Sequence, residues 1–355
     1  VVPVVRGIQE QGVAACVKHF AANNQETDRI RVSAQVSERA LQEIYLPAFK
    51  AAVQEGDAWS IMSAYNGING TPCSENADML KRRLRDEWGF RGYVVSDWFA
   101  ARFTSSTEAC VKGGLSLEMP GKGARYTPKK LQVGLDAGAF SEADIDTNLV
   151  GLLRAMVLTG HLDPERRRGQ RNTPEHRAVA REMSEASMTL LKNAGGLLPL
   201  DPSRAKKIAL LGPRLKKRNC LPLWGGSAGV WSPSEVTPWQ GLQAENAGRF
   251  EWVKHPQDAD AVLLFVGLSH RPGLDSEVRD RTSLELPWEQ DKLVRETVAA
   301  NPNTVVVLLC GSPVAMPWID EVPTVLVAWY PGMEGGTAIA RTLFGDVNPG
   351  GKLPV

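Results

Sequence analysis

Gly92-Tyr93-Val94-Val95-Ser96-Asp97-Trp98 is the stretch on which the fold prediction depends. A short apolar, β-rich run ends abruptly at a carboxylate that stands between a hydroxyl group and a large aromatic ring. Such a run, with Gly92 at its start, favours a buried strand. Carboxylates at the carboxyl ends of parallel strands lie where α/β folds place their chemistry. An isolated Asp in this position would nevertheless more often cap the following helix.

Three more apolar runs surround this stretch, and each ends in polar or aromatic residues. They are 14–17 before Lys18-His19-Phe20, 58–64 before Tyr65-Asn66-Gly67, and 115–117 before Glu118-Met119-Pro120-Gly121. Helices are predicted between them over 37–52, 76–88 and 105–112, the first with an apolar stripe of Leu41, Ile44, Tyr45, Ala48, Phe49 and Ala52. This alternation is typical of βα units in a parallel sheet. In a (β/α)₈ barrel the segments after the strands share one mouth, so we expect convergence of Lys18, His19, Tyr65, Asp97 and Glu118.

The second half of the chain also follows an α/β pattern. A helix is predicted over 141–160, an exposed linker over 163–176 and an amphipathic helix over 177–193. Near-continuous apolar strands follow, separated by helices such as 288–300, and they indicate a doubly wound sheet: 207–212, 261–267, 304–311 and 324–332. The glycine-rich piece 224–229 lacks the strand-turn-helix context of a nucleotide-binding motif.

Composition and charge argue against several classes of partner and cofactor. Lys and Arg number 41 against 40 Asp and Glu, so the net charge of +1 offers no electrostatic reason to expect nucleic acid or an anionic membrane as partner. No apolar run approaches the roughly 20 residues of a spanning helix. The five Cys have no C-x-x-C spacing and the His residues no ligand spacing, so we expect no metal and no cofactor. The chain opens at Val1 without a signal-peptide pattern, so we expect a processed or incomplete chain.

A collinear series of motifs resembles the β-glucosidase-like members of glycoside hydrolase family 3. The resemblance spans nearly the whole chain, and its motifs are Lys18-His19-Phe20, Asn23-Asn24-Gln25-Glu26 with Arg29, Met62-Ser63-Ala64-Tyr65-Asn66, Ser96-Asp97-Trp98, Leu117-Glu118-Met119-Pro120-Gly121, Leu190-Leu191-Lys192-Asn193, Leu197-Leu198-Pro199-Leu200, Asp280-Arg281, Leu286-Pro287, Trp329-Tyr330-Pro331-Gly332, Leu343-Phe344-Gly345-Asp346 and Gly351-Lys352-Leu353-Pro354.

The resemblance implies an α/β chain in three parts. Residues 1–162 would be the C-terminal part of a (β/α)₈ TIM-like barrel, 163–186 a linker and leading helix, and 187–355 an α/β sandwich domain. A whole barrel takes about 250 residues, so we expect the missing N-terminal barrel half to come from the same or another chain. The usual polysaccharide substrates of the family favour a periplasmic or secreted location.

The resemblance also implies roles for particular residues. Asp97 matches the catalytic nucleophile, and Glu277 matches the acid/base, although this chain has Val278 where the family often has Gly. The matches to residues that contact the terminal sugar are Lys18, His19, Tyr65, Trp98 and Met62. We expect Glu118 to support the barrel mouth rather than react. Glu26 and Arg29 form either a structural ion pair or a sugar contact.

Together these matches predict a retaining, exo-acting β-glycosidase. A carboxylate and a carboxyl group about 5–5.5 Å apart would act by double displacement. A β-glucosidase releasing terminal β-D-glucose is the first reading. A β-xyloside, an arabinoside or a β-glucan end is the alternative substrate. A non-catalytic sugar-binding fragment of the same fold is the alternative from another functional class.

Overall fold

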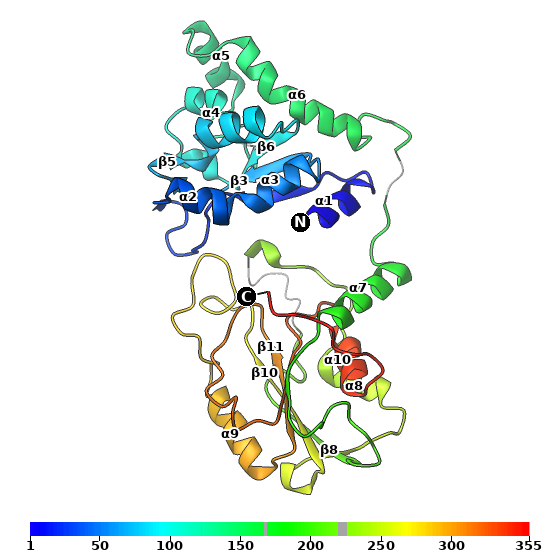
Figure 1. Ribbon diagram of the computed structural model, residues 1–355. Helices are drawn as coiled ribbons and strands as arrows, with labels where there is room; N and C mark the ends of the chain where they lie inside the picture. Colours follow the sequence, from blue (N-terminus) through cyan, green and yellow to red (C-terminus); the bar gives the residue numbers. More distant parts are fainter. Residues whose placement is uncertain (122, 167–168, 219–225, 355) are drawn as a thin grey trace. The chain divides into compact units, whose positions relative to one another are not determined.

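The chain divides into two compact units, Val1–Arg168 and Gly169–Val355. The computed structural model describes residues 1–121, 123–166, 169–218 and 226–354. Cys220 and the first part of the glycine-rich piece, 224–225, lie outside the described residues. The first unit is coloured blue to green and the second green to red in Figure 1.

Three parallel strands form the centre of the first unit. They are β1 (Cys16–Phe20), β3 (Ser60–Ser63) and β6 (Tyr93–Ser96), in the order β1-β3-β6. A second small sheet contains β2 (Ser33–Ala34), β4 (Gly67–Ile68) and β5 (Thr71–Pro72). The helical segments are α1 (Val2–Gln9), α2 (Glu38–Ala40), π-helical turns at Leu41–Tyr45 and Asp78–Glu87, α3 (Pro47–Gln54), 3₁₀ turns at Cys73–Glu75 and Ala100–Phe103, α4 (Thr107–Gly113), α5 (Pro128–Asp136) and α6 (Glu142–Leu158).

The fourth predicted strand of this unit is reduced to a single parallel bridge between Val95 and Leu117. Helix α3 packs against β1, and α6 packs against β6. All three strands run in the same direction, so their carboxyl ends lie at one edge of the sheet. That edge positions the candidate site.

The apolar stripe predicted over 37–52 is wrong in its middle. Ile44 is 70% exposed, whereas Leu46, which the stripe leaves out, is 1% exposed. The cause is the π-helical turn Leu41–Tyr45, which holds more residues per turn and so rotates the following side chains. Pro47, which has no N–H to donate, then starts α3.

A six-stranded sheet forms the second unit, in the order β7-β12-β11-β10-β8-β9. Its pairings are parallel except that of β7 with β12. The strands are β7 (Thr189–Asn193), β8 (Lys207–Leu211), β9 (Glu251–Val253), β10 (Ala261–Gly267), β11 (Thr304–Leu309) and β12 (Thr324–Val327). The helices are α7 (Pro174–Ser187), α8 (Pro238–Glu245), α9 (Gln290–Ala300) and α10 (Gly335–Leu343), with 3₁₀ turns at Gly226–Ala228 and Pro256–Asp258.

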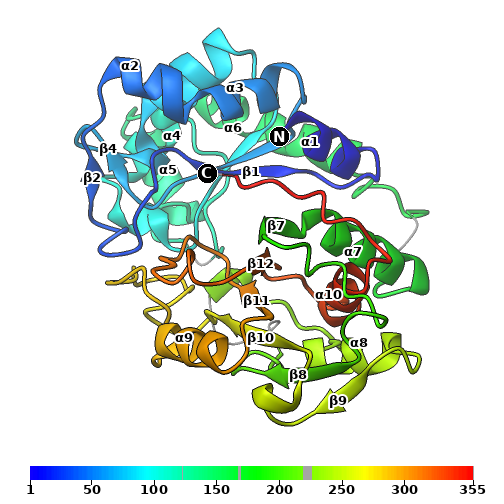
Figure 2. The same ribbon diagram turned by 60° about the horizontal axis from the view of Figure 1, so that its bottom comes forward.

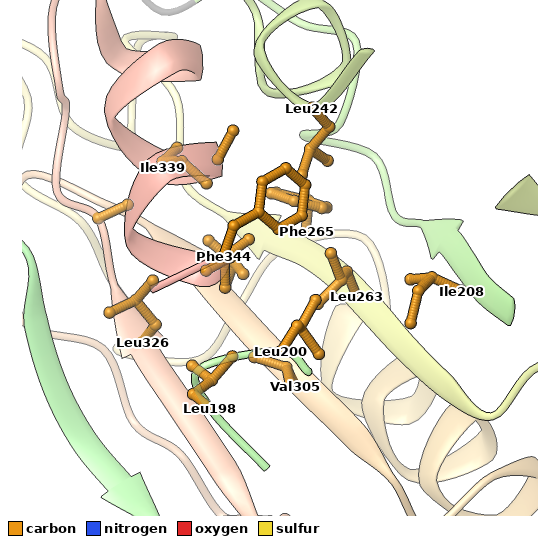
Figure 3. Packing of buried hydrophobic residues seen from close by; sticks show 14 of the residues in the cluster. Leu198, Leu200, Ile208, Leu242, Leu263, Phe265, Val305, Leu326, Ile339 and Phe344 are labelled. Carbon is orange, nitrogen blue, oxygen red and sulfur yellow. The ribbon is translucent and has the colours of Figure 1, made fainter. Parts of the chain in front are cut away.

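Helices cover both faces of this sheet, α9 on one face and α8 with α10 on the other (Figure 2). Alternate residues of each central strand therefore enter different cores, and every residue of β10 is buried. Figure 3 shows Phe265 of β10 with Leu242 of α8, Ile339 of α10 and Phe344 in the second of these cores. Burying each such side chain contributes about 1.5–3 kcal/mol.

The helix predicted over 177–193 is wrong in its second part. Helix α7 begins after the N-cap Thr173, ends at Ser187 and gives way to strand β7. Leu190 packs into the core under α8 and α10, and Leu191 packs into the core under α9. That alternation satisfies both faces of the sheet, and the pairing with β12 satisfies the backbone, so tertiary contacts override the helical pattern.

No helix within the described ranges combines the length and apolarity needed to cross a bilayer. Cys73, Cys110 and Cys310 are buried free thiols, and Cys16 is exposed.

Candidate active site

Asp97 lies immediately after β6, at the carboxyl edge of the parallel sheet, and is 7% exposed. Its Oδ1 accepts a hydrogen bond from the Trp98 N–H at 2.7 Å. Its Oδ2 lies 3.2 Å from Nε2 of His19, which is part of β1 at the other side of the sheet. The following 3₁₀ turn has Phe99 as its N-cap and no side-chain cap, so the capping alternative for Asp97 is wrong.

The surroundings of Asp97 favour its ionised form. Burial acts to raise the pKa of this carboxyl, but the hydrogen bonds from His19 and the Trp98 N–H, the charge of His19 and the hydrogen bond with Tyr65 outweigh it. The pKa is therefore held below its usual value of 3.8. At neutral pH the site holds a partly desolvated carboxylate, which is the form that a nucleophile needs.

Tyr65 follows β3 and is held from its other side by Arg29. The Arg29 guanidinium carbon lies 4.5 Å from the centre of the Tyr65 ring, and an Arg29 nitrogen lies 2.9 Å from Oε2 of Glu26. The ion pair between Glu26 and Arg29 is therefore present. Its additional contact with Tyr65, a cation–π interaction, links the loop before β2 to the candidate site.

The remaining predicted sugar contacts differ in exposure. Trp98 is 43% exposed and Lys18 is exposed, so both side chains are accessible to a ligand. Met62 is 8% exposed within β3 and belongs largely to the interior. Phe99 has a φ of +67°, a conformation that is costly for a non-glycine residue and is often found at functional sites.

Glu118 supports the loop that follows the sheet edge, as we expected. Its buried carboxylate accepts hydrogen bonds from the N–H groups of Ala124 at 2.6 Å, Arg125 at 2.9 Å and Tyr126 at 2.7 Å. The same loop is connected to Asp97 through the Phe99 N–H, which donates to the Met119 carbonyl at 3.0 Å. With both oxygens occupied by backbone donors, Glu118 serves as a structural residue.

Glu277 belongs to the second unit, in the long segment between β10 and α9. The Ser227 N–H donates to Oε1 of Glu277 at 2.7 Å, and the Ser227 hydroxyl donates to the same oxygen. A Cβ at Gly226 would lie 2.4 Å from Cδ of Glu277, so only glycine permits this approach. Val278 has a φ of +78°, which favours glycine and gives a physical reason for the Gly expected at this position.

The structure thus brings together His19, Tyr65, Asp97 and Trp98 within the first unit. Glu277 is held separately within the second unit, and its pairing with Asp97 stays a prediction. Sequence reasoning missed Ser227, for which the tight glycine at 226 is the available signal. Among the described residues, no group of three or more His, Cys, Asp or Glu side chains is placed to hold a metal ion.

Two family models together match most of the chain. The glycosyl hydrolase family 3 N terminal domain matches residues 1–155, and the glycosyl hydrolase family 3 C-terminal domain matches residues 188–355. The chain belongs to glycosyl hydrolase family 3. This confirms the family that the motifs predict, together with the α/β fold class of a barrel-like first part and a sheet-containing second part.

Family 3 relatives of known name match the chain from end to end. Thermostable beta-glucosidase B of Acetivibrio thermocellus is 38% identical, over 98% of this chain and 47% of that protein. The exo-alpha-(1->6)-L-arabinopyranosidase of Bifidobacterium longum is 36% identical, over 99% of this chain and 48% of that protein. The structure of beta-glucosidase 3B from Thermotoga neapolitana in complex with glucose has a TM-score of 0.88 at 30% identity, covering 99% of this chain and 55% of that chain. This family 3 chain spans about half the length of the curated relatives it matches.

Proposed function

We propose that this chain carries the catalytic residues of a retaining β-glycosidase that removes terminal sugars, with β-D-glucose as the substrate sugar. The observation that carries the proposal is the buried Asp97 carboxylate with its lowered pKa, held by His19 and Tyr65 at the strand edge. Membership of family 3 and the names of the β-glucosidase relatives support it.

In the first step, an Asp97 oxygen attacks the anomeric carbon while the glycosidic C–O bond breaks. Glu277 donates its proton to the departing oxygen, so the leaving group departs as a neutral alcohol. The product of this step is a glycosyl ester on Asp97. In the second step, Glu277 takes a proton from water, the water oxygen attacks the anomeric carbon, and the ester bond to Asp97 breaks. Two inversions at one carbon retain its configuration.

This scheme requires the Asp97 and Glu277 carboxyl groups to face one sugar about 5–5.5 Å apart. The exposed Trp98 ring would offer an apolar face to the C–H side of the sugar. His19 and Lys18 would hydrogen-bond its hydroxyl groups. A β-xyloside, an arabinoside or a β-glucan end is the alternative substrate. The relative named as an arabinopyranosidase supports the arabinoside among these alternatives.

Trapping of the nucleophile tests the proposal directly. The full-length protein is incubated with a 2-deoxy-2-fluoro-β-glucoside that has an activated leaving group, digested and analysed by mass spectrometry. We expect the label on the peptide containing Asp97, and we expect Asp97→Ala to abolish aryl β-glucoside hydrolysis. Asp136→Ala, at an exposed position at the end of α5, is the matched control and should remain active.

Two results would contradict the proposal. Turnover retained in Asp97→Ala would remove Asp97 as nucleophile. Glucose binding by the unchanged protein, without turnover of any glycoside in a chromogenic panel, would instead favour the non-catalytic sugar-binding alternative. Turnover of xylosides or arabinosides rather than glucosides would keep the mechanism and change the sugar.

A further inference from the structure

We propose that Asp275 is a positioning residue for Glu277, an inference that rests on the proposed function. Asp275 stands two residues before Glu277 in the segment that follows β10. In the sequence it belongs to a charged run that reads as a solvated loop. In the structure its carboxylate is instead held by the ends of two other strands.

Three donors converge on the Asp275 carboxylate. The Gly311 N–H donates to Oδ2 at 2.8 Å, and the Tyr330 hydroxyl donates to the same oxygen at 2.8 Å. The Ser312 hydroxyl donates to Oδ1. Gly311 and Ser312 follow β11, and Tyr330 follows β12, so the loop from β10 is tied to its neighbour β11 and to the next strand, β12, at their carboxyl ends. Hydrogen bonds to a charged acceptor are stronger than neutral ones.

The packing around these donors leaves little room for another arrangement. A Cβ at Gly311 would lie 2.6 Å from Cε2 of Tyr330 and 3.3 Å from Oδ2 of Asp275, so the close approach requires glycine. Burial, and next the Asp275 charge, raise the pKa of Tyr330, so its hydroxyl stays a donor. The backbone of Asp275 is fixed as well, since its N–H donates to the Ser269 carbonyl at 3.1 Å. The ring of His270 packs 4.3 Å from that of Tyr330.

Fixing Asp275 restricts Glu277. Two residues of chain span at most about 7 Å, and Val278 turns the backbone directly after Glu277 through its φ of +78°. The carboxyl of Glu277 itself is held by Ser227. An acid that must reach one glycosidic oxygen loses rate steeply when it is displaced, by roughly 100-fold for a displacement of 1 Å. Asp275 therefore affects the reaction by fixing the position of Glu277, without contacting the sugar itself.

Leaving-group dependence separates this role from a purely structural one. A 2,4-dinitrophenyl leaving group departs without a proton, whereas a phenyl leaving group needs one from Glu277. The full-length protein and its variants are assayed for kcat/KM on both β-glucosides. Glu277→Gln should lose about 10²- to 10⁴-fold on the phenyl glucoside and change little on the dinitrophenyl glucoside. Asp275→Asn should show the same selectivity with a loss of about 10- to 100-fold.

Two further variants complete the test. Tyr330→Phe removes one donor but keeps the carboxylate, so it should show a smaller loss with the same selectivity, even where Asp275→Asn folds poorly. Asp320→Asn, the same change at an exposed position, should leave kcat/KM for both substrates unchanged. Added azide should raise the kcat of Asp275→Asn on the dinitrophenyl glucoside, because azide needs no general base.

The two hypotheses fail in different ways. Equal losses on both substrates in Asp275→Asn and Tyr330→Phe, with Glu277→Gln remaining selective, would overturn the positioning role alone. Unchanged rates in both variants would also overturn it. Absence of selectivity in Glu277→Gln would overturn the role of Glu277 in the proposed function, and the role of Asp275 with it.

Discussion

Replacement of Glu118 by Gln tests whether the sheet-edge loop depends on a charged acceptor. The carboxylate is 6% exposed and accepts backbone hydrogen bonds from Ala124, Arg125 and Tyr126 at 2.6–2.9 Å. In Gln one oxygen still accepts, but the amide group turns its own N–H toward N–H donors. A hydrogen bond to a charged group contributes about 1.5–3 kcal/mol, and an unsatisfied buried donor costs about 1–3 kcal/mol, so we expect a loss of about 3 kcal/mol.

For a unit of this size that loss corresponds to a fall in melting temperature of about 6–12 °C. Differential scanning calorimetry of the full-length protein measures it in the transition that contains the first unit. Glu108→Gln is the matched control, because Glu108 forms an exposed ion pair with Lys112 at 3.0 Å, and its loss should cost less than about 0.5 kcal/mol. If Glu118→Gln melts within about 2 °C of Glu108→Gln, the carboxylate does not hold the loop.

Three further predictions follow from the same geometry. His19→Ala should raise the pKa of Asp97, so the acidic limb of the kcat/KM profile moves to higher pH. Because the pKa of Asp97 is lowered in the folded protein, the ionised carboxylate stabilises the fold above the usual pKa, and this stabilisation is lost as the pH falls through the lowered value. In pH-dependent melting, His19→Ala should narrow this acidic pH range. Val278→Gly should raise the melting temperature of the second unit by relieving about 1–2 kcal/mol of backbone strain, and a decrease would contradict that reasoning. Gly226→Ala should displace the Glu277 carboxyl and reduce phenyl glucoside turnover about 10-fold or more. An unchanged rate would show that the close contact between Gly226 and Glu277 does not matter for turnover.

Strands β8, β10, β11 and β12 of the second unit could be predicted because a parallel sheet covered on both faces leaves long apolar runs, whereas the three-residue edge strand β9 leaves no such run. Strand β7 could not, since Leu190 and Leu191 fit a helical stripe as well as a strand, and only pairing with β12 decides between them. The buried position predicted for Ile44 is wrong for a local reason. A π-helical turn changes the spacing of side chains along the helix, and nothing in the amino-acid composition of the segment indicates such a turn.

The candidate site was predictable where it follows from strand ends. Asp97, His19 and Tyr65 each follow or end an apolar run, and parallel pairing gathers such ends at one edge. The 3.2 Å approach of His19 to Asp97 depends on the register of β1, β3 and β6, which no motif specifies. Asp275 could not be recognised, because its three donors come from segments 36 to 55 residues away in the chain.

The tight fit of Gly311 against the Tyr330 ring should couple the residue types that these two positions accept. A side chain larger than hydrogen at 311 meets the aromatic ring at 2.6 Å, so it becomes tolerable only after 330 has lost that ring. Family members should therefore fall into two groups, one with glycine and an aromatic residue at these positions and one in which both have changed. Many family members with a bulky residue at position 311 and tyrosine at position 330 would contradict this prediction. They would show that the backbone at 311 can shift more easily than its packing against the ring implies.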